Sequence, residues 1–262
     1  MKPYGYCNLS CVPLRAAASH RSEMVSQLLF GDTFEIMGTE GSWLAVQCSH
    51  DDYQGFIDER QCLLISDKEY QHLQQAHDQY ASAAASYVTD QTGNRTYIFP
   101  AANMRGFRNG QLALGATTFS FNEPLHKPAH PTTGANLVAS ARQYLNAPYL
   151  WGGRTTAGID CSGLTQNVFK QNGIALHRDA AMQATLGETI HLIWEAHPGD
   201  LAFFDNTEGD ITHVGIITGE GTIIHASGFV RIDDIDHQGI FDTTTRKYTH
   251  NLRIIKRLIG EG

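Results

Sequence analysis

The sequence predicts an α+β domain over residues 131–262, preceded by one or two small all-β barrels over residues 1–130. Residues 1–66 contain short strand-like runs separated by Gly and Asp turns, which is typical of a small barrel. An apolar helical pattern begins near residue 161, and strand-like runs then follow one another over residues 200–259. A helix that packs on an antiparallel sheet of consecutive strands is an α+β arrangement.

The composition limits the classes of function. The chain of 262 residues exceeds one typical domain, and its formal net charge of −8 argues against a nucleic-acid partner, because phosphate binding requires a basic face. No run of about 18 apolar residues is present, so no membrane partner is expected. The amino terminus lacks the apolar run of a signal peptide and the five cysteines form no CxxC pair, so we expect a cytoplasmic protein. A chain cut after a signal peptide would look the same and would be periplasmic or secreted.

The first module, residues 1–66, has the landmarks of one known barrel type. It contains a glycine turn at 38–41, a strand in which Trp43 stands three residues before Val46, and a late glycine-aromatic pair, Gly55-Phe56. These features resemble the bacterial SH3-like (SH3b) module.

A helix and a second small module are expected next. Ser66 and Glu69 have the spacing of a capping box, and apolar side chains at helical intervals then predict a helix over about residues 67–86. Residues 87–121 return to strand-like runs and predict a second SH3-like barrel, and the prolines and glycine of residues 122–134 are typical of a linker. The expected domains are therefore residues 1–66, 67–130 and 131–262.

Two histidine pairs in this part of the chain do not predict a metal site. His72 and His77 are five residues apart, so they do not share a helix face. His126 and His130 are four apart, but the neighbouring prolines argue against a helix. We expect neither a metal nor a cofactor.

Cys161 is the candidate nucleophile. It stands between Asp160 and Ser162 at the start of a predicted helix, where unpaired backbone N–H groups and the helix dipole favour an anion. Such a position lowers the pKa of a thiol and raises its reactivity. The alternative for any single cysteine is a buried, inert side chain.

Two histidines are expected beside this cysteine. His213 and His225 lie in strand-like runs that flank a hairpin turn at 219–221, and their midpoint is residue 219. In a regular hairpin they would stand opposite one another on one face, although a slip of one residue would separate them. One histidine can act as a base toward Cys161 while the other orients it. The alternative is a hydrogen-bonded or surface pair without catalytic function.

Five motifs in order make the pattern specific. They are Tyr149-Leu150-Trp151-Gly152-Gly153, Asp160-Cys161-Ser162-Gly163, Pro198-Gly199-Asp200-Leu201-Ala202-Phe203-Phe204, His213-Val214-Gly215-Ile216 and Ile224-His225-Ala226-Ser227-Gly228. Over residues 135–262 the chain resembles the NlpC/P60 family of papain-like cysteine peptidases. With the SH3-like modules, the whole resembles the γ-D-glutamyl-L-diamino acid endopeptidases that process cell-wall peptides. One departure is His177-Arg178, where the family pattern leads us to expect Pro-Arg.

The resemblance implies a mechanism and three catalytic roles. Cys161 is the nucleophile, His213 is the base and His225 is the third, polar member of the triad. The thiolate attacks the γ-D-glutamyl carbonyl, His213 protonates the leaving amine, and water hydrolyses the thioester to release L-Ala-γ-D-Glu. Tyr149 is assigned to stabilising the oxyanion, the alternative being an aromatic side chain that only packs in a turn.

The expected substrate is a murein tripeptide or tetrapeptide with a free L-Ala terminus. Asp160 could pair with the ammonium of that terminus, which would exclude acylated or glycan-linked peptides. Ser162 is expected to contact substrate or to cap the helix. From the resemblance we also nominate Glu23 and Tyr53 of the first SH3-like module as substrate-binding residues.

Two other functions remain open at this stage. An amidase or acyltransferase of the same fold could use the same constellation on another acyl group, because a Cys-His-His set does not determine the substrate. A non-enzymatic protein that binds cell-wall peptides is the other alternative, and the intact Cys161, His213 and His225 argue against it.

Overall fold

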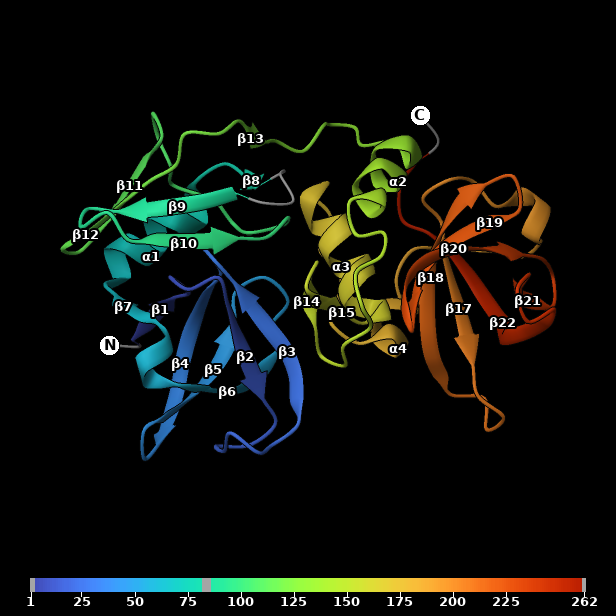
Figure 1. The fold of residues 1–262 in the computed structure, drawn as a ribbon, viewed down its shortest axis with the longest axis horizontal. Coiled ribbons are helices and arrows are strands. Elements are labelled where there is room, and N and C mark those ends of the chain that lie inside the picture. Colours follow the sequence, from blue (N-terminus) through green and yellow to red (C-terminus); the bar gives the residue numbers. More distant parts are fainter. Residues whose placement is uncertain (1–2, 82–85, 261–262) are drawn as a thin grey trace. The chain divides into compact units, whose positions relative to one another are not determined.

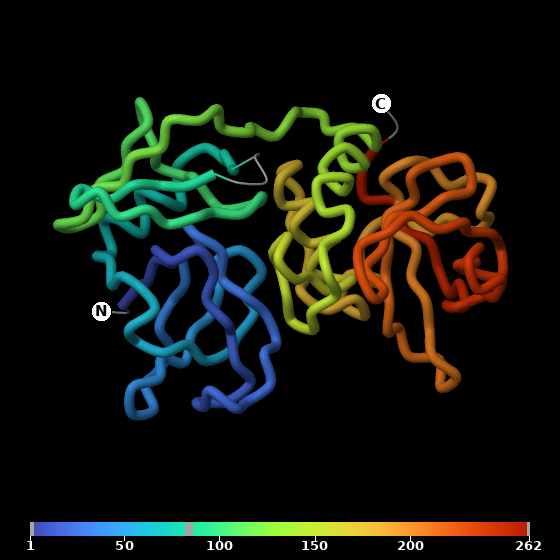
Figure 2. The backbone as a smooth tube through the Cα atoms, viewed as in Figure 1, coloured from blue at the N-terminus to red at the C-terminus, as the bar shows by residue number. Residues whose placement is uncertain are grey.

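The computed structural model describes residues 3–81 and 86–260, which form two compact units (Figures 1 and 2). The first unit contains the described residues up to Pro128 together with the short segment Trp151–Thr155. The second unit contains Ala129–Leu150 and the described residues from Thr156 onward. Each unit is described by itself.

The first part of unit one is an antiparallel all-β module. Its strands follow the order β3-β2-β6-β5-β4-β1-β7 in one sheet. Their bounds are β1 Tyr4–Tyr6, β2 Cys11–Arg15, β3 Met24–Leu29, β4 Thr33–Glu40, β5 Trp43–Cys48, β6 Gln54–Asp58 and β7 Leu63–Ile65, with a 3₁₀ turn, η1, at Glu59–Gln61. Buried and partly buried residues alternate along β2 and β5, which places Val12, Leu44 and Val46 in the core. The small barrel expected over residues 1–66 is confirmed.

Helix α1, Asp67–Gln75, is shorter than predicted. Its capping box is present, because the hydroxyl of Ser66 accepts from the backbone N–H of Glu69 and the Glu69 carboxylate accepts from that of Ser66. The helix ends at Gln75 rather than near residue 86, so the predicted end is wrong. The periodic apolar residue Tyr80 belongs instead to strand β8, Tyr80–Ala81, which pairs with β13, Leu125–His126. Residues 82–85 of the predicted helix lie outside the described residues.

A second sheet in unit one shares a hydrophobic core with the first. Its strands are β9 Ser86–Asp90, β10 Arg95–Ile98, β11 Gln111–Leu114 and β12 Thr117–Ser120, in the order β10-β9-β12-β11. Tyr6 and Phe30 of the barrel, Leu73 of α1 and Phe119 of β12 belong to one buried cluster. The strands expected over residues 87–121 are therefore present, and burial against the barrel stabilises them.

Unit two consists of helices and a single antiparallel sheet. The sheet order is β16-β22-β17-β18-β19-β20-β21, and β21 also pairs with β22. The strands are β16 Glu188–Ile190, β17 Leu201–Asp205, β18 Ile211–Gly219, β19 Thr222–Ser227, β20 Phe229–Ile235, β21 Gly239–Asp242 and β22 Lys247–Arg257. The helices are α2 Gly134–Arg142, α3 Cys161–Gln171 and α4 Ala180–Gln183, with a 3₁₀ turn, η2, at Ile193–Glu195. A short strand segment, β15 Gly158–Ile159, precedes α3, and the segment β14, Arg154–Thr155, belongs to unit one.

Helix α3 is buried along its whole length, and the predicted α+β arrangement is confirmed. Leu164 and Val168 of α3 share a buried cluster with Phe203 of β17 and Val214 of β18. The next residue along β17, Phe204, belongs to a separate cluster, because successive side chains of a strand point to opposite faces. Among residues 3–81 and 86–260, no helix is long and apolar enough to cross a membrane.

Candidate active site

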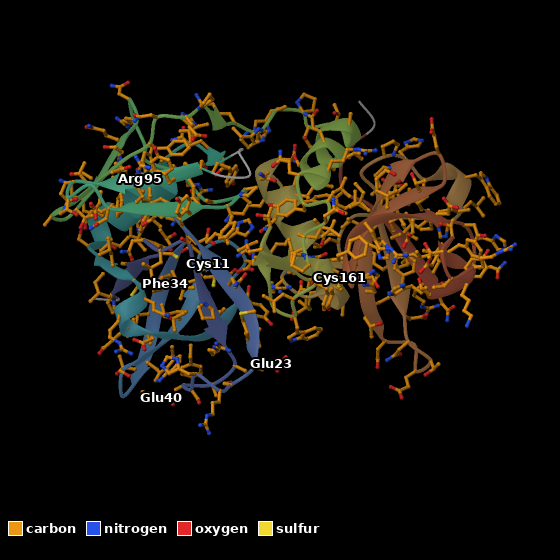
Figure 3. The ribbon with its side chains drawn as sticks, viewed as in Figure 1. Cys11, Glu23, Phe34, Glu40, Arg95 and Cys161 are labelled. Carbon is orange, nitrogen blue, oxygen red and sulfur yellow. The ribbon has the colours of Figure 1, made fainter. Side chains whose placement is uncertain are left out.

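The cysteine predicted to be the nucleophile is the first residue of helix α3 (Figure 3). Asp160 is the N-cap, and its Oδ1 accepts a hydrogen bond from the backbone N–H of Gly163 at 2.7 Å. Val214, the residue after His213, offers its backbone N–H to the sulfur of Cys161, as does Ser162. The predicted position of Cys161 at a helix N-terminus is confirmed, and β18 carries His213 next to the residue that contacts the sulfur.

The thiol of Cys161 is less acidic than its helix position predicted. Burial and the neighbouring Asp160 carboxylate raise the pKa of Cys161 to about 11, against the hydrogen bonds from Val214 and Ser162. The expected lowering is therefore wrong. A thiolate at a site that is 5% exposed loses its hydration, and the capping carboxylate offsets the positive end of the helix. In the free protein Cys161 is a neutral thiol.

The hairpin that carries the histidines has a different register from the predicted one. His225 pairs with Gly215, not with His213, and the ladder shifts between Ile217 and Gly219. The prediction of a directly opposed pair is wrong, because the tight turn is Glu220-Gly221, both with positive φ, and a bulge precedes it. A shift of two residues preserves the face, so His213 and His225 still lie on the same side of the sheet.

A glycine leaves room for the diagonal contact between the two rings. A Cβ atom at Gly215 would lie 2.9 Å from the Cβ of His225. Without that atom, Nε2 of His213 approaches Nδ1 of His225 to 2.9 Å, and the rings are nearly perpendicular at 85°. Both histidines are buried, with 6% and 1% of their surfaces exposed. The structure therefore joins the predicted base and the predicted third member by a hydrogen bond.

The hydrogen-bond chain continues beyond the predicted residues. Nε2 of His225 lies 2.9 Å from Oδ2 of Asp233 on β20, and Arg231 donates to both oxygens of that carboxylate. Burial raises the pKa of Asp233, but hydrogen bonds from His225 and Arg231 outweigh it and the pKa is lowered. Sequence reasoning missed Asp233. The alternation of β20 held a usable signal, because Arg231 and Asp233 occupy one strand face.

A third histidine packs on the first two and was also missed. The ring of His250 on β22 stacks on that of His213, with centroids 4.2 Å apart and 26° between the planes. Burial lowers the pKa of His213 well below its ordinary 6.5, and the charges of His250 and His225 lower it further. Burial likewise lowers the pKa of His250 to about 4, with His225 adding to the effect. His213 is therefore neutral and available to accept a proton.

The three histidines offer ring nitrogens within 4.8 Å of one another, which raises the question of a metal. A histidine binds a metal through a lone pair in the plane of its ring. The stacked rings of His213 and His250 direct these lone pairs along nearly parallel planes, and Nε2 of His213 already faces Nδ1 of His225. We therefore interpret the cluster as a base with its neighbours.

Arg178 connects two of the predicted substrate-binding residues. It donates to Oδ2 of Asp160 at 2.5 Å and to the hydroxyl of Ser162 at 2.7 Å. The Arg178 and Asp160 side chains are only 2% and 6% exposed. Ser162 is not the helix cap, because Asp160 has that role, so the capping alternative for Ser162 is wrong. Substrate contacts by Asp160 and Ser162 remain predictions, and the sequence signal for Arg178 was the unusual His177-Arg178 pair.

Tyr149 lies beside the nucleophile. Burial raises its pKa to about 12, and the charges of Cys161 and Asp160 raise it further. Its backbone N–H donates to the carbonyl of Gly228 at 2.9 Å, and its side chain remains 36% exposed. A tyrosine with this pKa keeps its proton, so it can donate a hydrogen bond to a developing oxyanion. That role remains a prediction.

Glu23 and Tyr53 belong to unit one. Glu23 precedes β3, is exposed and is labelled in Figure 3; its Oε1 accepts a hydrogen bond from the indole of Trp151 at 2.6 Å. Tyr53 is partly buried against the core of the barrel, and its N–H donates to Asp51. Their predicted contacts with substrate remain predictions.

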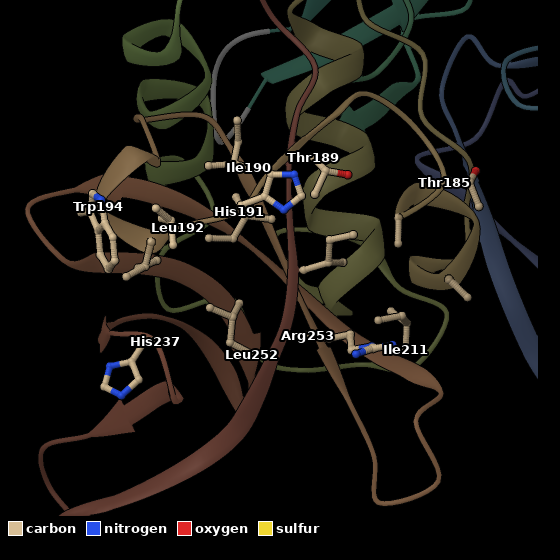
Figure 4. A pocket seen from close by; sticks show the side chains of 15 residues that line it. Thr185, Thr189, Ile190, His191, Leu192, Trp194, Ile211, His237, Leu252 and Arg253 are labelled. Carbon is tan, nitrogen blue, oxygen red and sulfur yellow. The ribbon is translucent and has the colours of Figure 1, made fainter.

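A cavity elsewhere in unit two contains none of the predicted site residues (Figure 4). Its volume is about 650 Å³, and its lining includes Thr185 after α4, Trp194 of η2 and Leu252 of β22. The chemistry proposed for Cys161 therefore does not depend on this cavity.

Comparison with known proteins connects both units to one class. The model of the NlpC/P60 family matches residues 146–249, and that of the bacterial dipeptidyl-peptidase Sh3 domain matches residues 14–61. The gamma-D-glutamyl-L-lysine dipeptidyl-peptidase of Bacillus subtilis (strain 168) is 28% identical over 214 residues, which cover 77% of this chain and 71% of that protein. The probable endopeptidase p60 of Listeria seeligeri is 41% identical over 104 residues, but the match covers only 39% of this chain and 20% of that protein.

A solved structure supports the fold. The crystal structure of an NlpC/P60 family protein from Bacillus cereus ATCC 10987 matches with a TM-score of 0.82 and 16% identity, covering 98% of this chain and 100% of that one. At this identity the likeness concerns the fold alone. The predicted papain-like catalytic fold with an amino-terminal SH3-like barrel is confirmed by these matches together.

Proposed function

This chain carries an NlpC/P60 domain after a bacterial SH3 domain of the dipeptidyl-peptidase type and is a cysteine peptidase, and we propose that it hydrolyses the γ-D-glutamyl-L-diamino acid bond of cell-wall peptides. The observation that carries the proposal is the arrangement of Cys161 at the start of α3 beside β18, with His213 hydrogen-bonded to His225. The named activity of the Bacillus subtilis relative supports the choice of bond. We further propose a murein tripeptide or tetrapeptide as substrate and a cytoplasmic role in turnover or recycling.

The ionisation of the site suggests the order of proton transfers. Because the Cys161 thiol has a raised pKa and His213 a lowered one, both groups are neutral before substrate binds. His213 removes the thiol proton as sulfur attacks the γ-carbonyl carbon, and the carbonyl oxygen becomes an oxyanion that Tyr149 stabilises. His213 then gives the proton to the leaving amine. Water attacks the thioester, restores the thiol and releases L-Ala-γ-D-Glu.

The free L-Ala terminus is the proposed basis of selection. An ammonium group taken out of water requires a partner of opposite charge. We propose that Asp160 and Glu23 provide negative charge for it. Arg178 holds the Asp160 carboxylate in place. The indole of Trp151 holds one oxygen of Glu23 and thereby orients the carboxylate.

The test is hydrolysis of L-Ala-γ-D-Glu-meso-diaminopimelate, free and N-acetylated, followed by mass spectrometry of the products. We expect cleavage of the free peptide only and its loss in Cys161→Ala. Cys62→Ala is the matched control, because burial also raises the pKa of Cys62 to about 11, and this variant should retain full activity. Cleavage of other acyl groups but not of this bond would contradict the proposal.

A second comparison tests the ammonium site separately. Glu23→Gln removes the charge but keeps an acceptor for Trp151, so it should raise KM for the free peptide without changing stability. Glu40→Gln changes another exposed carboxylate of the same barrel and should have no effect. Equal cleavage of free and acetylated peptides would support the peptidase activity but contradict the proposed ammonium site.

A further inference from the structure

We propose that Asp233, held by Arg231, is a positioning residue that determines which nitrogen of each active-site histidine carries the proton. The inference rests on the proposed function, because it assigns a role to a residue behind the catalytic histidines. Asp233 contacts His225 rather than the sulfur of Cys161. It acts through His225, and His225 acts through His213.

The carboxylate is held in place from several sides. Nε of Arg231 donates to Oδ2 of Asp233 at 2.7 Å and Nη2 donates to Oδ1 at 2.9 Å, which is the two-pronged geometry that arginine forms with carboxylates. Nη2 of Arg231 also lies 3.0 Å from Oδ2 of Asp242. The other oxygen of Asp242 accepts from the backbone N–H groups of Thr244 and Thr245. Asp233 therefore has little freedom to leave His225.

The sheet register explains the approach. His225 on β19 pairs directly with Arg231 on β20, and Asp233 is two residues further along the same strand face. Cross-strand and diagonal neighbours on one face are within reach of such side chains. Asp234 points to the other face and is exposed, so it offers a carboxylate of the same strand without the contact.

The donor and acceptor inventory then determines the tautomers. An ionised carboxylate can only accept, so Nε2 of His225 must carry a hydrogen to make its 2.9 Å bond with Asp233. When the His225 ring is neutral, its lone pair is then on Nδ1, which accepts from Nε2–H of His213 at 2.9 Å. Neutral His213 is left with its lone pair on Nδ1. Both histidines therefore donate their N–H toward Asp233. At the other end of this hydrogen-bond chain, Nδ1 of His213 is left as the basic nitrogen.

The same chain stabilises the charge that forms during reaction. When His213 takes the thiol proton, its positive charge is two hydrogen bonds from the Asp233 carboxylate. Among the residues that the structure describes, the other charged or titratable groups around this carboxylate are Arg231 and Asp242, whose charges offset each other, and His250, whose ring centroid is 5.7 Å from that of His225. Asp233 therefore supplies the net negative charge at its end of the hydrogen-bond chain from His213 through His225.

Asp233→Asn is the direct test. The amide can donate to Nε2 of His225, which reverses both tautomers and points Nδ1–H of His213 at the sulfur. We expect kcat to fall at least about 100-fold with KM little changed, because a carboxylate that orients a catalytic histidine acts mainly on the chemical step. The matched control, Asp234→Asn, should remain within about twofold of the wild type, as expected for an exposed surface change.

Two readouts distinguish positioning from a structural role. Nitrogen-15 NMR of the histidine side chains reports tautomers directly, and wild type should show Nε2–H on both His225 and His213. Alkylation of Cys161 by iodoacetamide, followed by peptide mapping, needs no peptide substrate and should slow in Asp233→Asn but not in Asp234→Asn.

The outcomes separate this inference from the proposed function. The wild type could fail to cleave the peptide and yet show the expected tautomers, with slowed alkylation in Asp233→Asn. That result would contradict the proposed substrate but support the positioning role of Asp233. Nδ1–H on His225 in wild type would overturn the inference even if Asp233→Asn failed to fold. A folded Asp233→Asn with kcat within threefold of the wild type would overturn it as well.

Discussion

Replacement of Arg178 by Met tests whether burial makes an ion pair indispensable in this protein. Two arginine-aspartate pairs of the described residues have almost the same shortest N···O distance. Arg178 lies 2.5 Å from Asp160 with side chains 2% and 6% exposed, and Arg60 lies 2.6 Å from Asp58 with the arginine 76% and the aspartate 4% exposed. The distances are similar, so the two pairs differ chiefly in the burial of the arginine: water can take the place of the exposed Arg60 side chain but not that of the buried Arg178 side chain.

The two substitutions should differ severalfold in their cost. Arg178→Met removes the arginine partner of the buried Asp160 carboxylate, and removing one partner of a buried pair costs about 3–5 kcal/mol. Water replaces the exposed Arg60 side chain, so Arg60→Met should cost clearly less than Arg178→Met. The double change Asp160→Asn with Arg178→Met removes both charges and should recover most of the loss.

Hydrogen exchange measured by mass spectrometry is the suitable assay, because a chain of two units need not unfold in one step. Arg178→Met should accelerate exchange of the most protected α3 amides by about 100-fold to a few thousand-fold, by the rule of tenfold per 1.4 kcal/mol. Arg60→Met should accelerate exchange in β6 clearly less than that. Equal effects of the two single variants, or a double variant as unstable as Arg178→Met, would refute the reasoning.

Two further predictions concern pH and backbone conformation. Because the pKa of His213 lies below its ordinary 6.5, the acidic limb of kcat/KM should lie below pH 6.5, while alkylation of Cys161 should still rise toward pH 11. An acidic limb centred above pH 6.5 would contradict this ionisation. In unit one, an alanine Cβ at Gly31 (φ +86°) would lie 1.6 Å from the carbonyl oxygen of Asn103, whereas Gly41 (φ +61°) has no atom within 4 Å. Gly41→Ala should cost only the roughly 1–2 kcal/mol of left-handed backbone and Gly31→Ala clearly more, so equal melting temperatures would count against the close approach.

Local sequence patterns predicted the structure correctly where the interactions that determine it are between residues close in the sequence. The capping box at Ser66 and Glu69 depends on residues three apart, and it was predicted correctly. The end of the same helix was not, because Tyr80 follows the helical period but is buried in strand β8. Periodicity cannot distinguish these outcomes when a distant strand, here β13, provides the backbone partners.

In the β18–β19 hairpin of the site, the sequence likewise predicted one feature correctly and another wrongly. Alternation placed His213 and His225 on one face, because strand parity is a property of the sequence. Their register was wrong by two residues, because the Glu220-Gly221 turn and the bulge before it depend on backbone conformation. The histidines meet nevertheless, because Gly215 leaves the diagonal open.

The sequence by itself determined the fold class, the helix that begins at Cys161 and the shared face of its two histidines, since these depend on the order and spacing of residues. Only the tertiary structure decided the protonation of the site and the partners behind it. The pKa of a thiol depends on how much water and which charges surround it. The helix position alone would lower the pKa of Cys161, but burial and the Asp160 carboxylate raise it. Arg178 is 17 residues and Asp233 is 72 residues after Cys161 in the sequence. No local motif therefore contains their contacts.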